Sequence, residues 1–516
     1  MNGAQSLVST LVGQGVDVCF ANPGTSEMHF LAALGDPRMR GVLCLFEGVC
    51  TGAADGYYRM ADKPAATLLH LGPGLANGLA NIHNARRASS GMVNVVGEHA
   101  TAHLKYDAPL TSDIEGLARP LSHWVRRADS ALTIASDTSA AIAKAREHPG
   151  RIATLILPGD TAWQDAGVPL PAVATAPSKR APDTARIEQV AKVLRSGEPA
   201  MLILANKACR IEPMELAGQV AAGTGCRLAS QFFTNRIERG AGRVPLERIP
   251  YSVAPALKFL QPIKHLILLE TKEPVAFFSY PGQPSLLKAP GTQLHILSEP
   301  DEDSTLALQI LVDALGLGNA QPMLQQPANC AMPSGKLDPI SIAYALCAGI
   351  PENAIVVDES LTSGRESMSY TLGARPHDMI NNLGGSIGYS PPVATGAALA
   401  CPDRRTICLV GDGSAMYTIQ ALWTQAREQL PVTTVVFANN TYNILKAEYA
   451  NMGAGDRPSE AALTMIDIDR PTIDWLSMGK AMGVPGVQVD TAEGLAQALL
   501  DANREAGPRL IEVKLY

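Results

Sequence analysis

The stretch CLVGDGSAMYTIQALWTQAREQLPVTTVVFANNTYNIL, residues 408–445, decides the fold. An apolar run stops at residues 411–414, which read Gly-Asp-Gly-Ser, and a helical pattern follows over residues 417–428. A second apolar run, residues 432–438, ends at Asn-Asn-Thr, residues 439–441. Strand, polar loop, helix, strand and polar loop in this order place both loops at the carboxyl edge of a parallel sheet, where such sheets bind ligands.

Both polar loops carry oxygen ligands with little charge. The first offers the Asp412 carboxylate, the Ser414 hydroxyl and backbone N–H groups, and the second offers amide and carbonyl oxygens. Such ligands suit Mg²⁺, which completes its octahedron with waters and with the phosphates of a ligand. Gly-Asp-Gly alone is more often an ordinary turn. Because Asn439 follows Asp412 by 439 − 412 = 27 residues, room for one helix and one strand, the pair predicts a site for a magnesium diphosphate.

Composition indicates a soluble enzyme. The 516 residues are enough for about three domains. A net charge of −7 without a basic run argues against nucleic acid and anionic membranes as partners. No apolar stretch reaches the roughly 18 residues of a membrane span, and the N-terminus lacks the features of a signal peptide. The nine cysteines form no CxxC pair, so we expect buried free thiols and a cytoplasmic location.

Helix and strand patterns alternate along the chain, which predicts an α/β fold with doubly wound parallel sheets. Residues 158–183 and 318–335 have the composition of linkers. We therefore expect three such domains, residues 1–175, 184–320 and 336–516. Small residues at positions 52–56 would let a helix over residues 48–59 pack closely. The predicted strands outside the opening stretch are residues 16–20, 41–46, 65–70, 92–96, 153–157, 200–204, 266–269 and 294–297.

The whole chain resembles the thiamine diphosphate (ThDP)-dependent decarboxylase and acetolactate synthase family. The N-terminal half is most similar to benzoylformate decarboxylase, whereas Gly-Pro-Gly at residues 72–74 is similar to acetolactate synthases. The resemblance implies a first domain that binds the aminopyrimidine of ThDP, a middle spacer domain and a third domain that binds the diphosphate. The motifs that carry it are Gly-Asp-Gly with the later Asn439, Asn-Pro-Gly at residues 22–24, Glu47, Ala-Asp-Gly-Tyr at residues 54–57 and Leu69-His70.

The resemblance also assigns residues to the cofactor. The metal ligands would be Asp412, Asn439 and the backbone carbonyl of Thr441. Ile387 would be the apolar wedge that bends the cofactor, and the Gly385 carbonyl would accept a hydrogen bond from its amino group. The residues expected to contact the cofactor are Asn22, Pro23, Gly24, Glu47, Ser360, Leu361, Thr362, Gly385, Ser386, Ile387, Gly411, Asp412, Gly413, Ser414, Asn439, Thr441, Tyr442, Asn443 and Ile444, with Ser414 and Tyr442 donating to phosphate.

Glu47 has a chemical task of its own. ThDP becomes a nucleophile when its thiazolium carbon loses a proton to the cofactor's own amino group, which requires a carboxylic acid to support the imino form of the pyrimidine. Such an acid works in a partly dry pocket, and residues 42–50, VLCLFEGVC, are apolar on both sides of Glu47. We expect Glu47, at the end of a strand, to be this acid, although an isolated strand-end glutamate usually faces solvent.

His70 is the candidate for proton transfer at the reacting carbon, because imidazole titrates near neutrality and the position matches a family active-site histidine. A lone histidine after a strand is more often structural. His99 and His103 are weaker candidates, since they do not form an adjacent His-His pair. The predicted substrate pocket is uncharged and consists of Thr25, His70, Pro109, Leu110, Leu361, Ile444 and Leu445; nearby Lys446 and Glu448 would pair with each other or face solvent.

The chain departs from both subfamilies that it resembles. Benzoylformate decarboxylase has a histidine in the segment corresponding to residues 277–281, which read Phe-Phe-Ser-Tyr-Pro here. Acetolactate synthases have Asp-Ala-Phe-Gln where residues 107–110 read Asp-Ala-Pro-Leu. Residues 205–209, after the predicted strand 200–204, contain no glycine, and Arg210 alone is no flavin signature. FAD is therefore not expected.

We therefore expect a ThDP- and Mg²⁺-dependent carbon–carbon lyase or ligase that acts on small 2-oxo acids, aldehydes or 2-hydroxy ketones through an enamine intermediate. It would be a benzoylformate decarboxylase-like decarboxylase or carboligase, with an acetolactate synthase large-subunit-like enzyme as the alternative. A nucleotide-binding oxidoreductase is disfavoured because no G-x-G-x-x-G opens a helix with a later acidic residue. A non-enzymatic regulatory subunit would have lost Glu47, Asp412 or Asn439. Because the family builds each site from two chains, we expect a homodimer or homotetramer.

Overall fold

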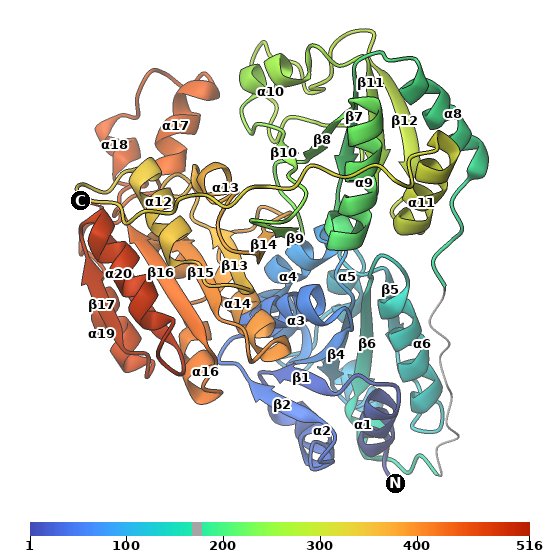
Figure 1. The fold of residues 1–516 in the computed structure, drawn as a ribbon. Helices are drawn as coiled ribbons and strands as arrows, with labels where there is room; N and C mark the ends of the chain where they lie inside the picture. The colour runs from blue at the N-terminus through green and yellow to red at the C-terminus, as the bar shows by residue number, and fades with distance from the viewer. Residues whose placement is uncertain (168–177, 516) are drawn as a thin grey trace.

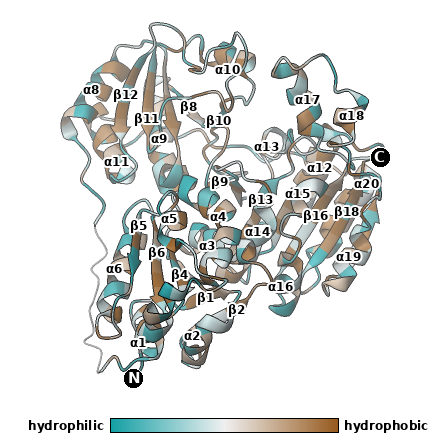
Figure 2. Ribbon diagram, turned by 180° about the vertical axis from the view of Figure 1, so that it is seen from behind, coloured by the Kyte–Doolittle hydropathy of each residue, from teal (hydrophilic) through white to brown (hydrophobic). Residues whose placement is uncertain are grey.

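The computed structural model describes residues 1–167 and 178–515, which fold into three α/β units (Figure 1). Each unit is built on its own sheet with helices packed against it. Strands are largely apolar, and polar residues gather on the outer helices and loops (Figure 2). In the described part of the chain, no helix combines the length and the apolar character that crossing a membrane requires. The predicted boundary at residue 175 lies outside the described residues.

The first unit holds a six-stranded parallel sheet in the order β2-β1-β3-β4-β6-β5. β2 is added on one side of β1, and β3 and the later strands are added on the other side. The direction in which the sheet grows therefore reverses between β1 and β3. The strands are β1 (Val18–Ala21), β2 (Arg40–Leu43), β3 (Ala65–Leu69), β4 (Met92–Glu98), β5 (Trp124–Arg127) and β6 (Ile152–Pro158). The helices are α1 (Gly3–Gly13), η1 (Thr25–Glu27), α2 (Met28–Ala33), α3 (Glu47–Ala61), α4 (Leu71–Arg87), η2 (Thr101–Tyr106), α5 (Ile114–Ala118), α6 (Ile134–Arg146) and α7 (Gly159–Trp163).

The middle unit holds a five-stranded parallel sheet in the order β10-β8-β7-β11-β12, with its reversal between β7 and β11. The strands are β7 (Ala200–Leu204), β8 (Arg227–Ser230), β10 (Glu247–Arg248), β11 (His265–Leu269) and β12 (Gln293–Ser298). The helices are α8 (Thr184–Arg195), η3 (Asn206–Cys209), α9 (Ile211–Thr224), α10 (Val253–Leu260) and α11 (Ser304–Leu315).

The third unit holds a seven-stranded sheet in the order β17-β18-β16-β15-β13-β14-β9, and the order reverses between β13 and β15. Its strands are β13 (Ala354–Glu359), β14 (His377–Asn381), β15 (Thr406–Gly411), β16 (Val432–Ala438), β17 (Gly486–Val489), β18 (Arg509–Lys514) and β9 (Ile237–Arg239). Its helices are α12 (Pro339–Gly349), α13 (Ser367–Tyr370), α14 (Ser390–Ala400), α15 (Asp412–Ala415), α16 (Ala421–Arg427), α17 (Asn443–Asn451), α18 (Glu460–Leu463), α19 (Trp475–Ala481) and α20 (Ala492–Ala502).

The predicted α/β fold of three doubly wound parallel-sheet units is thus confirmed, but several details of the prediction are wrong. β9 comes from the middle of the chain and pairs antiparallel with β14, so the third sheet is not purely parallel. The predicted strand 41–46 is β2, which ends at Leu43, and Glu47 therefore begins helix α3 instead of ending a strand. The predicted helix 417–428 is confined to α16, because α15 starts directly after β15 and a turn separates the two.

Helices α3 and α14 hold the first and third units together. A Cβ added at Gly56 would lie 2.0 Å from the Val393 carbonyl oxygen, and one at Gly396 would lie 1.8 Å from the Ala53 carbonyl oxygen. Backbone therefore meets backbone, as the small residues at positions 52–56 predict. Apolar residues of both units form one continuous buried core, which runs from Val18 in β1 to Leu510 in β18. Units that are far apart in sequence are packed on each other.

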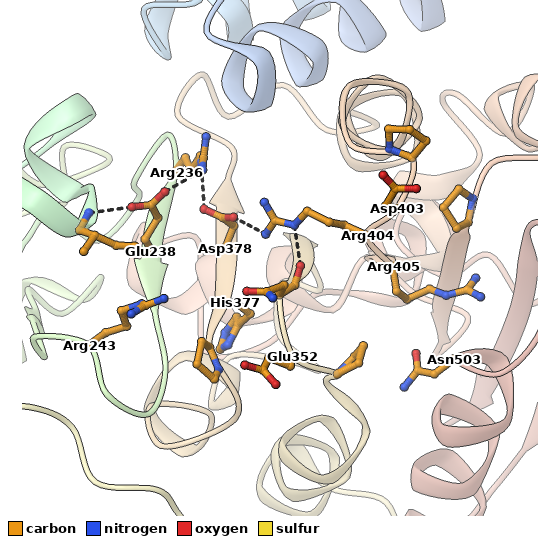
Figure 3. Close-up of a pocket in the computed structure, with 16 residues that line it drawn as sticks. Arg236, Glu238, Arg243, Glu352, His377, Asp378, Asp403, Arg404, Arg405 and Asn503 are labelled. Carbon is orange, nitrogen blue, oxygen red and sulfur yellow. Dashed lines mark hydrogen bonds and ion pairs between the residues drawn. The ribbon is translucent and has the colours of Figure 1, made fainter.

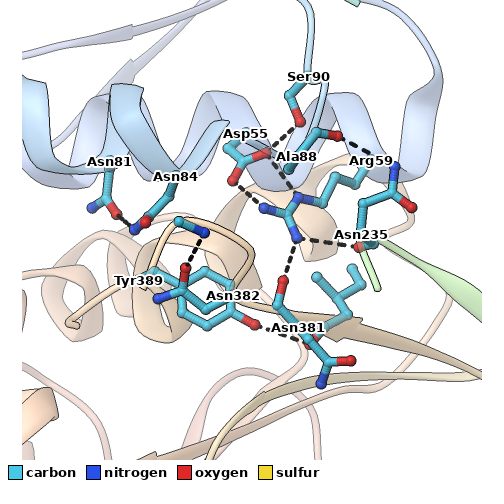
Figure 4. A network of polar contacts seen from close by, with 12 residues as sticks. Asp55, Arg59, Asn81, Asn84, Ala88, Ser90, Asn235, Asn381, Asn382 and Tyr389 are labelled. Carbon is cyan, nitrogen blue, oxygen red and sulfur yellow. Dashed lines mark hydrogen bonds and ion pairs between the residues drawn. The ribbon is translucent and has the colours of Figure 1, made fainter. Parts of the chain in front are cut away.

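A buried polar network joins all three units near this contact (Figure 4). The Arg59 guanidinium donates two hydrogen bonds to the Asp55 carboxylate, and both side chains are 1% exposed. Arg59 also donates to the carbonyl oxygens of Asn235, from the middle unit, and Asn381, from the third unit. Ser90 donates to Asp55 from the loop after α4. A buried ion pair needs such additional partners, and here they fix the three units relative to one another.

The cysteines differ from the prediction in one pair. Cys330 and Cys347 form a disulfide, with a Cα–Cα distance of 5.4 Å. Seven described cysteines are free, and six of them are buried. The pair was not predictable, since Cys330 lies in the segment 318–335 and its sequence does not show that this segment runs beside α12.

Candidate active site

The carboxyl edge of the first sheet brings Gly24, Glu27 and His70 together at the reversal between β1 and β3. The His70 ring lies against Gly24, where an added Cβ would come within 2.2 Å of Nδ1. His70 Nδ1 is 2.8 Å from Glu27 Oε2, and the same oxygen accepts a hydrogen bond from the Gly24 N–H at 2.8 Å. Burial raises the pKa of the Glu27 carboxyl, although its hydrogen bond with His70 opposes this shift. An acid–imidazole pair thus lies at this edge.

Glu47 begins α3 beside the start of α4. The residue is 6% exposed, and its Oε2 accepts a hydrogen bond from Asn77 Nδ2 at 3.0 Å. A side chain at Gly74 would start 3.1 Å from Glu47 Oε1 and 3.3 Å from His70 Cβ. Glu47 and His70 therefore flank Gly74, and the absence of a side chain there keeps the space between them open.

The carboxyl edge of the third sheet carries the Gly-Asp-Gly segment at the reversal between β13 and β15. Asp412 is 2% exposed and accepts hydrogen bonds from the N–H groups of Gly413 at 2.8 Å and Asn440 at 2.6 Å. Burial raises the pKa of Asp412, and these two N–H donors oppose the shift. A Cβ at Gly413 would lie 2.5 Å from the Tyr442 ring. The two loops of the opening stretch therefore touch, as predicted.

The loop after β16 is fixed from its outer side. Thr441 donates its hydroxyl to Asp467 at 2.7 Å, and the Tyr442 N–H donates to the Ile466 carbonyl at 3.0 Å. The Asn439 amide oxygen accepts from the Thr441 N–H at 3.1 Å. The Thr441 carbonyl accepts from the Asn443 N–H at 2.9 Å, which leaves its second lone pair for another partner.

The side chains of Asn382 and Glu359 hold the glycine-rich loop before α14. The Asn382 amide oxygen accepts from the N–H groups of Gly384 and Gly385 at 3.1 and 3.0 Å, and its amide nitrogen donates to the Ser386 carbonyl. Gly385 adopts φ +78°, a conformation that glycine reaches without strain. Glu359 accepts from the Gly388 N–H at 2.7 Å, and burial raises the pKa of Glu359 to about 7.

These residues fit a magnesium diphosphate. The carboxylate of Asp412, the amide oxygen of Asn439 and the free lone pair of the Thr441 carbonyl are hard oxygen donors with a single negative charge. The Ser414 hydroxyl oxygen is buried and has no hydrogen-bond partner among the described residues. A buried unpaired hydroxyl is costly, and a phosphate oxygen would satisfy it. Ser360, by contrast, donates to Asp358 at 2.5 Å and is already occupied.

The remaining predicted residues lie on the segments around these two edges. A Cβ at Gly72 would lie 1.9 Å from Ser112 Oγ, so the loop with Pro109 and Leu110 lies near the start of α4. Asn443 donates to Thr362 at 3.4 Å, which joins the loops after β16 and β13. Several predicted apolar side chains keep part of their surface accessible: Leu361 and Leu445 are exposed, and Leu110, Ile387 and Ile444 are partly buried. Thr25 is exposed at the start of η1, after Asn22 and Pro23.

Lys446 does not pair with Glu448. Its ammonium group is 2.6 Å from Asp467 Oδ1, the carboxylate that also accepts from Thr441. The alternative that Lys446 and Glu448 pair with each other is therefore wrong. The reason lies in segment 466–468, which runs antiparallel beside the 440–442 loop and supplies a closer carboxylate than the next turn of α17.

At the carboxyl edge of the middle sheet, the polar side chains bind groups of the same chain. Glu270, directly after β11, is 2% exposed and accepts from the Lys207 N–H at 3.1 Å and the Ser304 hydroxyl at 2.5 Å. The cations of the neighbouring turn point elsewhere: Lys207 pairs with Asp62 at 3.1 Å, and Arg210 donates to the Arg236 carbonyl at 3.2 Å. The polar groups and cations at this edge are thus paired within the chain.

A cavity of about 730 Å³ lies at the opposite, amino edge of the third sheet (Figure 3). Arg236 lies between Glu238 and Asp378, and Arg404 also pairs with Asp378. Much of the charge that lines the cavity is therefore neutralised by ion pairs. None of the predicted cofactor residues lines this cavity. Its size therefore does not make it the active site.

Two residues with direct contacts to the predicted catalytic pair were missed. Glu27 contacts His70, and Asn77 contacts Glu47. Glu27 was recognisable in principle, because it follows Gly24 by three residues and thus has the spacing of a capping box. Asn77 has no such signal, since it meets Glu47 only through the packing of α3 on α4.

Comparison with known proteins agrees with this geometry. Residues 1–118 match the family model "Thiamine pyrophosphate enzyme, N-terminal TPP binding domain", and residues 363–513 match "Thiamine pyrophosphate enzyme, C-terminal TPP binding domain". Thiamine pyrophosphate is another name for ThDP. The two matches contain the two carboxyl edges described above.

Full-length relatives extend the likeness to the whole chain. The chain is 50% identical to the Mycobacterium tuberculosis protein described as "Putative acetolactate synthase large subunit IlvX", with 99% of both chains covered. It is 26% identical to benzoylformate decarboxylase of Pseudomonas aeruginosa, covering 97% of this chain and 96% of that one. The fold is similar to that of the 4-hydroxybenzoylformate decarboxylase of Rhodococcus jostii RHA1, with a TM-score of 0.84, 24% identity and coverage of 100% and 99%. The chain therefore belongs to the family of ThDP-dependent enzymes that includes acetolactate synthase large subunits and benzoylformate decarboxylase.

Proposed function

We propose that this protein is a Mg²⁺-dependent 2-oxo acid decarboxylase and carboligase that prefers apolar substrates. The observation that carries the proposal is the convergence of Glu47 with the His70–Glu27 pair on either side of Gly74. Decarboxylation needs an acid that activates the cofactor and a second group that delivers a proton to carbon. Glu47 and His70 would fill these two roles.

His70 would deliver the proton. When the bond between the carboxylate and the carbonyl carbon breaks, CO₂ leaves and the carbonyl carbon takes up a proton, which yields an aldehyde. Bound ThDP supplies the electron sink for this step. Glu27, whose Oε2 is 2.8 Å from His70 Nδ1, would fix the ring so that its other nitrogen carries out the transfer. Glu47, held by Asn77, would support the imino form of the pyrimidine.

The third unit would hold the diphosphate through Mg²⁺. Asp412, Asn439 and the Thr441 carbonyl would be the protein ligands, and Ser414 would donate its unpaired hydroxyl to a phosphate oxygen. Gly385 and Ile387 would position the aminopyrimidine and the bend of the cofactor. The support for this assignment is the contact of the two loops and the buried orphan hydroxyl.

The substrate pocket would favour a modest apolar group. Thr25, Pro109, Leu110, Leu361, Ile444 and Leu445 carry no charge, and the nearest lysine, Lys446, is paired with Asp467. Burying an unpaired second carboxylate there would cost several kcal/mol, whereas each buried methylene contributes roughly 0.8 kcal/mol. We expect pyruvate and larger apolar 2-oxo acids to exceed 2-oxoglutarate and oxaloacetate in kcat/KM.

A carboligase of the acetolactate synthase type is the second candidate. It is favoured by the 50% identical relative, whose description names an acetolactate synthase large subunit. In that reaction the carbon that lost CO₂ attacks a second 2-oxo acid, and no proton is delivered to it. His70 would then be dispensable for chemistry.

The working unit would be a homodimer or homotetramer that completes each site with two chains. Within one chain, the partners of the Glu47 carboxylate belong to the first unit and those of the Asp412 carboxylate to the third. Exposed apolar side chains flank both: Leu45, Leu361, Met416, Tyr417 and Leu445 are 41–53% exposed. Such side chains suit a subunit interface.

A product analysis tests the reaction. Purified protein with ThDP and Mg²⁺ is given a panel of 2-oxo acids, and CO₂, aldehyde and ketol are measured. We expect CO₂ with aldehyde, and a large loss of aldehyde in His70→Ala but not in His103→Ala, an exposed histidine that serves as control. Ketol as the sole product in both variants would establish the carboligase. Turnover of none of the panel would refute both.

A further inference from the structure

Helix α4 carries three asparagines, Asn77, Asn81 and Asn84, spaced four and three residues apart on one helix face. Asparagine is a poor residue for a helix interior, because its side chain competes for backbone hydrogen bonds. Three on one face therefore call for a reason outside the helix. Asn81 and Asn84 are 3% and 0% exposed, which excludes a solvated surface.

The first two asparagines hold the start of α3. Asn77 Nδ2 donates to Glu47 Oε2 at 3.0 Å, and Asn81 Nδ2 donates to the Gly48 carbonyl at 2.8 Å. Gly52, one turn further along α3, leaves room for Asn81, since a Cβ there would lie 3.1 Å from its amide nitrogen. The carboxyl group and the backbone next to it are thus fixed by the same face of α4.

The third asparagine holds the glycine-rich loop of the third unit. Asn84 Nδ2 donates to the Ser386 carbonyl at 2.9 Å, and Asn84 Oδ1 accepts from the Ser386 N–H at 3.1 Å. The neighbouring His83 donates its Nε2–H to the Gly384 carbonyl at 3.0 Å. Gly385 lies between two residues whose peptide groups α4 holds, so the direction of its carbonyl is set from the first unit.

A side-chain hydrogen bond connects the asparagine that holds α3 with the asparagine that holds the glycine-rich loop. Asn84 Nδ2 also donates to Asn81 Oδ1 at 3.0 Å, and the two amides lie side by side in Figure 4. Asn81 and Asn84, the two buried amides, each use both the oxygen and the nitrogen in a hydrogen bond. Seven residues of helix separate Asn77 from Asn84, a rise of about 10 Å. Amides also bring no charge beside Glu47, unlike lysine or aspartate.

We propose that Asn77, Asn81 and Asn84 form a positioning ladder that fixes the Glu47 carboxyl and the backbone of residues 384–386 relative to each other. The inference rests on the proposed function, in which Glu47 and Gly385 act on the aminopyrimidine. In the proposed dimer, the Glu47 end serves the site shared with the partner subunit, and the Ser386 end serves the site on this chain's own third unit. The ladder then links two cofactor sites.

A double-mutant cycle tests the ladder in the full-length protein. Asn77→Ala, Asn84→Ala and the double variant are titrated with ThDP and Mg²⁺, and thiazolium proton exchange of bound ThDP is measured by NMR. Asn77 is exposed, so its variant should keep its Tm and its ThDP affinity while exchange slows roughly tenfold to a hundredfold. Asn84→Ala should slow exchange and also weaken ThDP binding.

The coupling appears in the double variant. If the ladder acts as a unit, the double variant exchanges no more slowly than about the slower single variant. Fold losses that multiply would show two independent contacts and overturn the ladder, as would wild-type exchange in either single variant. Asn94→Ala is the matched control: Asn94 is equally buried and makes two hydrogen bonds in the first sheet, so it should lower Tm without changing exchange.

Two further variants keep the outcomes separable. Should Asn84→Ala fail to fold, Gly384→Ala takes its place, because the added Cβ would lie 2.3 Å from Asn84 Oδ1 and push the loop off the ladder. Wild-type exchange in Gly384→Ala would overturn the proposal. Glu47→Gln reports on the proposed function itself: if it exchanges like the wild type, Glu47 is not the activating acid, whatever the cycle shows.

Discussion

At the reversal of the third sheet the short helix α15, directly after β15, presents Asp412 and Ser414, and at the reversal of the middle sheet the loop after β11 presents Glu270. Both acids are buried, and burial raises the pKa of both, that of Glu270 to about 7. The Glu270 carboxylate accepts from Lys207 and Ser304, whereas the Ser414 hydroxyl beside Asp412 lacks a partner among the described residues. At the edge of the middle sheet the polar groups named here have partners within the chain, whereas at the edge of the third sheet the Ser414 hydroxyl does not.

The difference shows that topology alone does not make a ligand site. All three sheets reverse at one point and all place polar residues there. A ligand can bind where donors and acceptors are left unpaired, and it is excluded where side chains of the same chain already pair them. The first and third edges meet this condition in our assignment, and the middle edge does not.

Removing one acid from each edge should have opposite effects on cofactor retention. Asp412→Ala should abolish retention of ThDP and Mg²⁺, because no metal would neutralise the diphosphate. Glu270→Ala should lose about 1–3 kcal/mol of stability, since two buried donors become unpaired, yet retain the cofactor. Cofactor content after gel filtration, measured by thiochrome fluorescence and metal analysis, decides between them. Stoichiometric ThDP in Asp412→Ala would remove our metal assignment.

At the first edge, Glu47→Gln should fold and bind ThDP but activate it poorly. Loss of a positioned acid typically costs about 10²–10⁴-fold in rate.

Mixing Glu47→Gln with Asp412→Ala chains should restore part of the activity, because a hybrid dimer has one intact site. A hybrid without activity, together with a fully active monomer in sedimentation, would contradict sites shared between chains.

A smaller effect is expected for Glu27→Gln. Its amide can still meet the Gly24 N–H but no longer fixes the His70 tautomer, so kcat should fall by up to about a hundredfold while ThDP affinity stays unchanged. The pH profile of kcat/KM supplies the check. An unaltered profile and rate would mean that Glu27 only shapes the turn.

The smallest effect concerns the edge of the middle sheet. The folded-state pKa of Glu270, about 7, lies above its ordinary value of 4.5, so its stabilising contribution is complete below pH 4.5 and is lost as the pH rises through 7. Glu270→Gln stays neutral and can accept from Lys207 and donate to Ser304. Its stability relative to the wild type should rise between pH 4.5 and 8, by up to about 3 kcal/mol. Denaturant midpoints at several pH values measure this, and a constant difference would contradict it.

Much of the fold was predictable from local patterns. The strand predicted at residues 200–204 coincides with β7, and residues 432–438 coincide with β16, because buried parallel strands are continuous apolar runs with clear ends. β5 and β8 were missed, since their sequences, WVRR and RLAS, contain charged or small residues. β9 pairs with a strand 140 positions away in an antiparallel direction, which no local pattern encodes.

The site was predictable where one short segment carries it and unpredictable where units meet. Asp412 and Asn439 could be singled out from the sequence by their residue types and their spacing. The contacts of Asn77 with Glu47 and of Asn84 with Ser386 depend on how α4 lies between α3 and the third unit. Their roles, like those of all the cofactor residues, stay predictions for the experiments above.

The core shared by the first and third units has a consequence for synthesis on the ribosome. Cys50 and Ala53 of α3 share one apolar cluster with Val393 of α14 and with Trp475 and Leu510. Helix α3 therefore emerges with an unpaired apolar face, and its partner helix α14 begins 390 − 61 = 329 residues later. During that interval, about 16–66 s at about 5–20 residues per second, the exposed face of α3 would be open to chaperones or to another nascent chain.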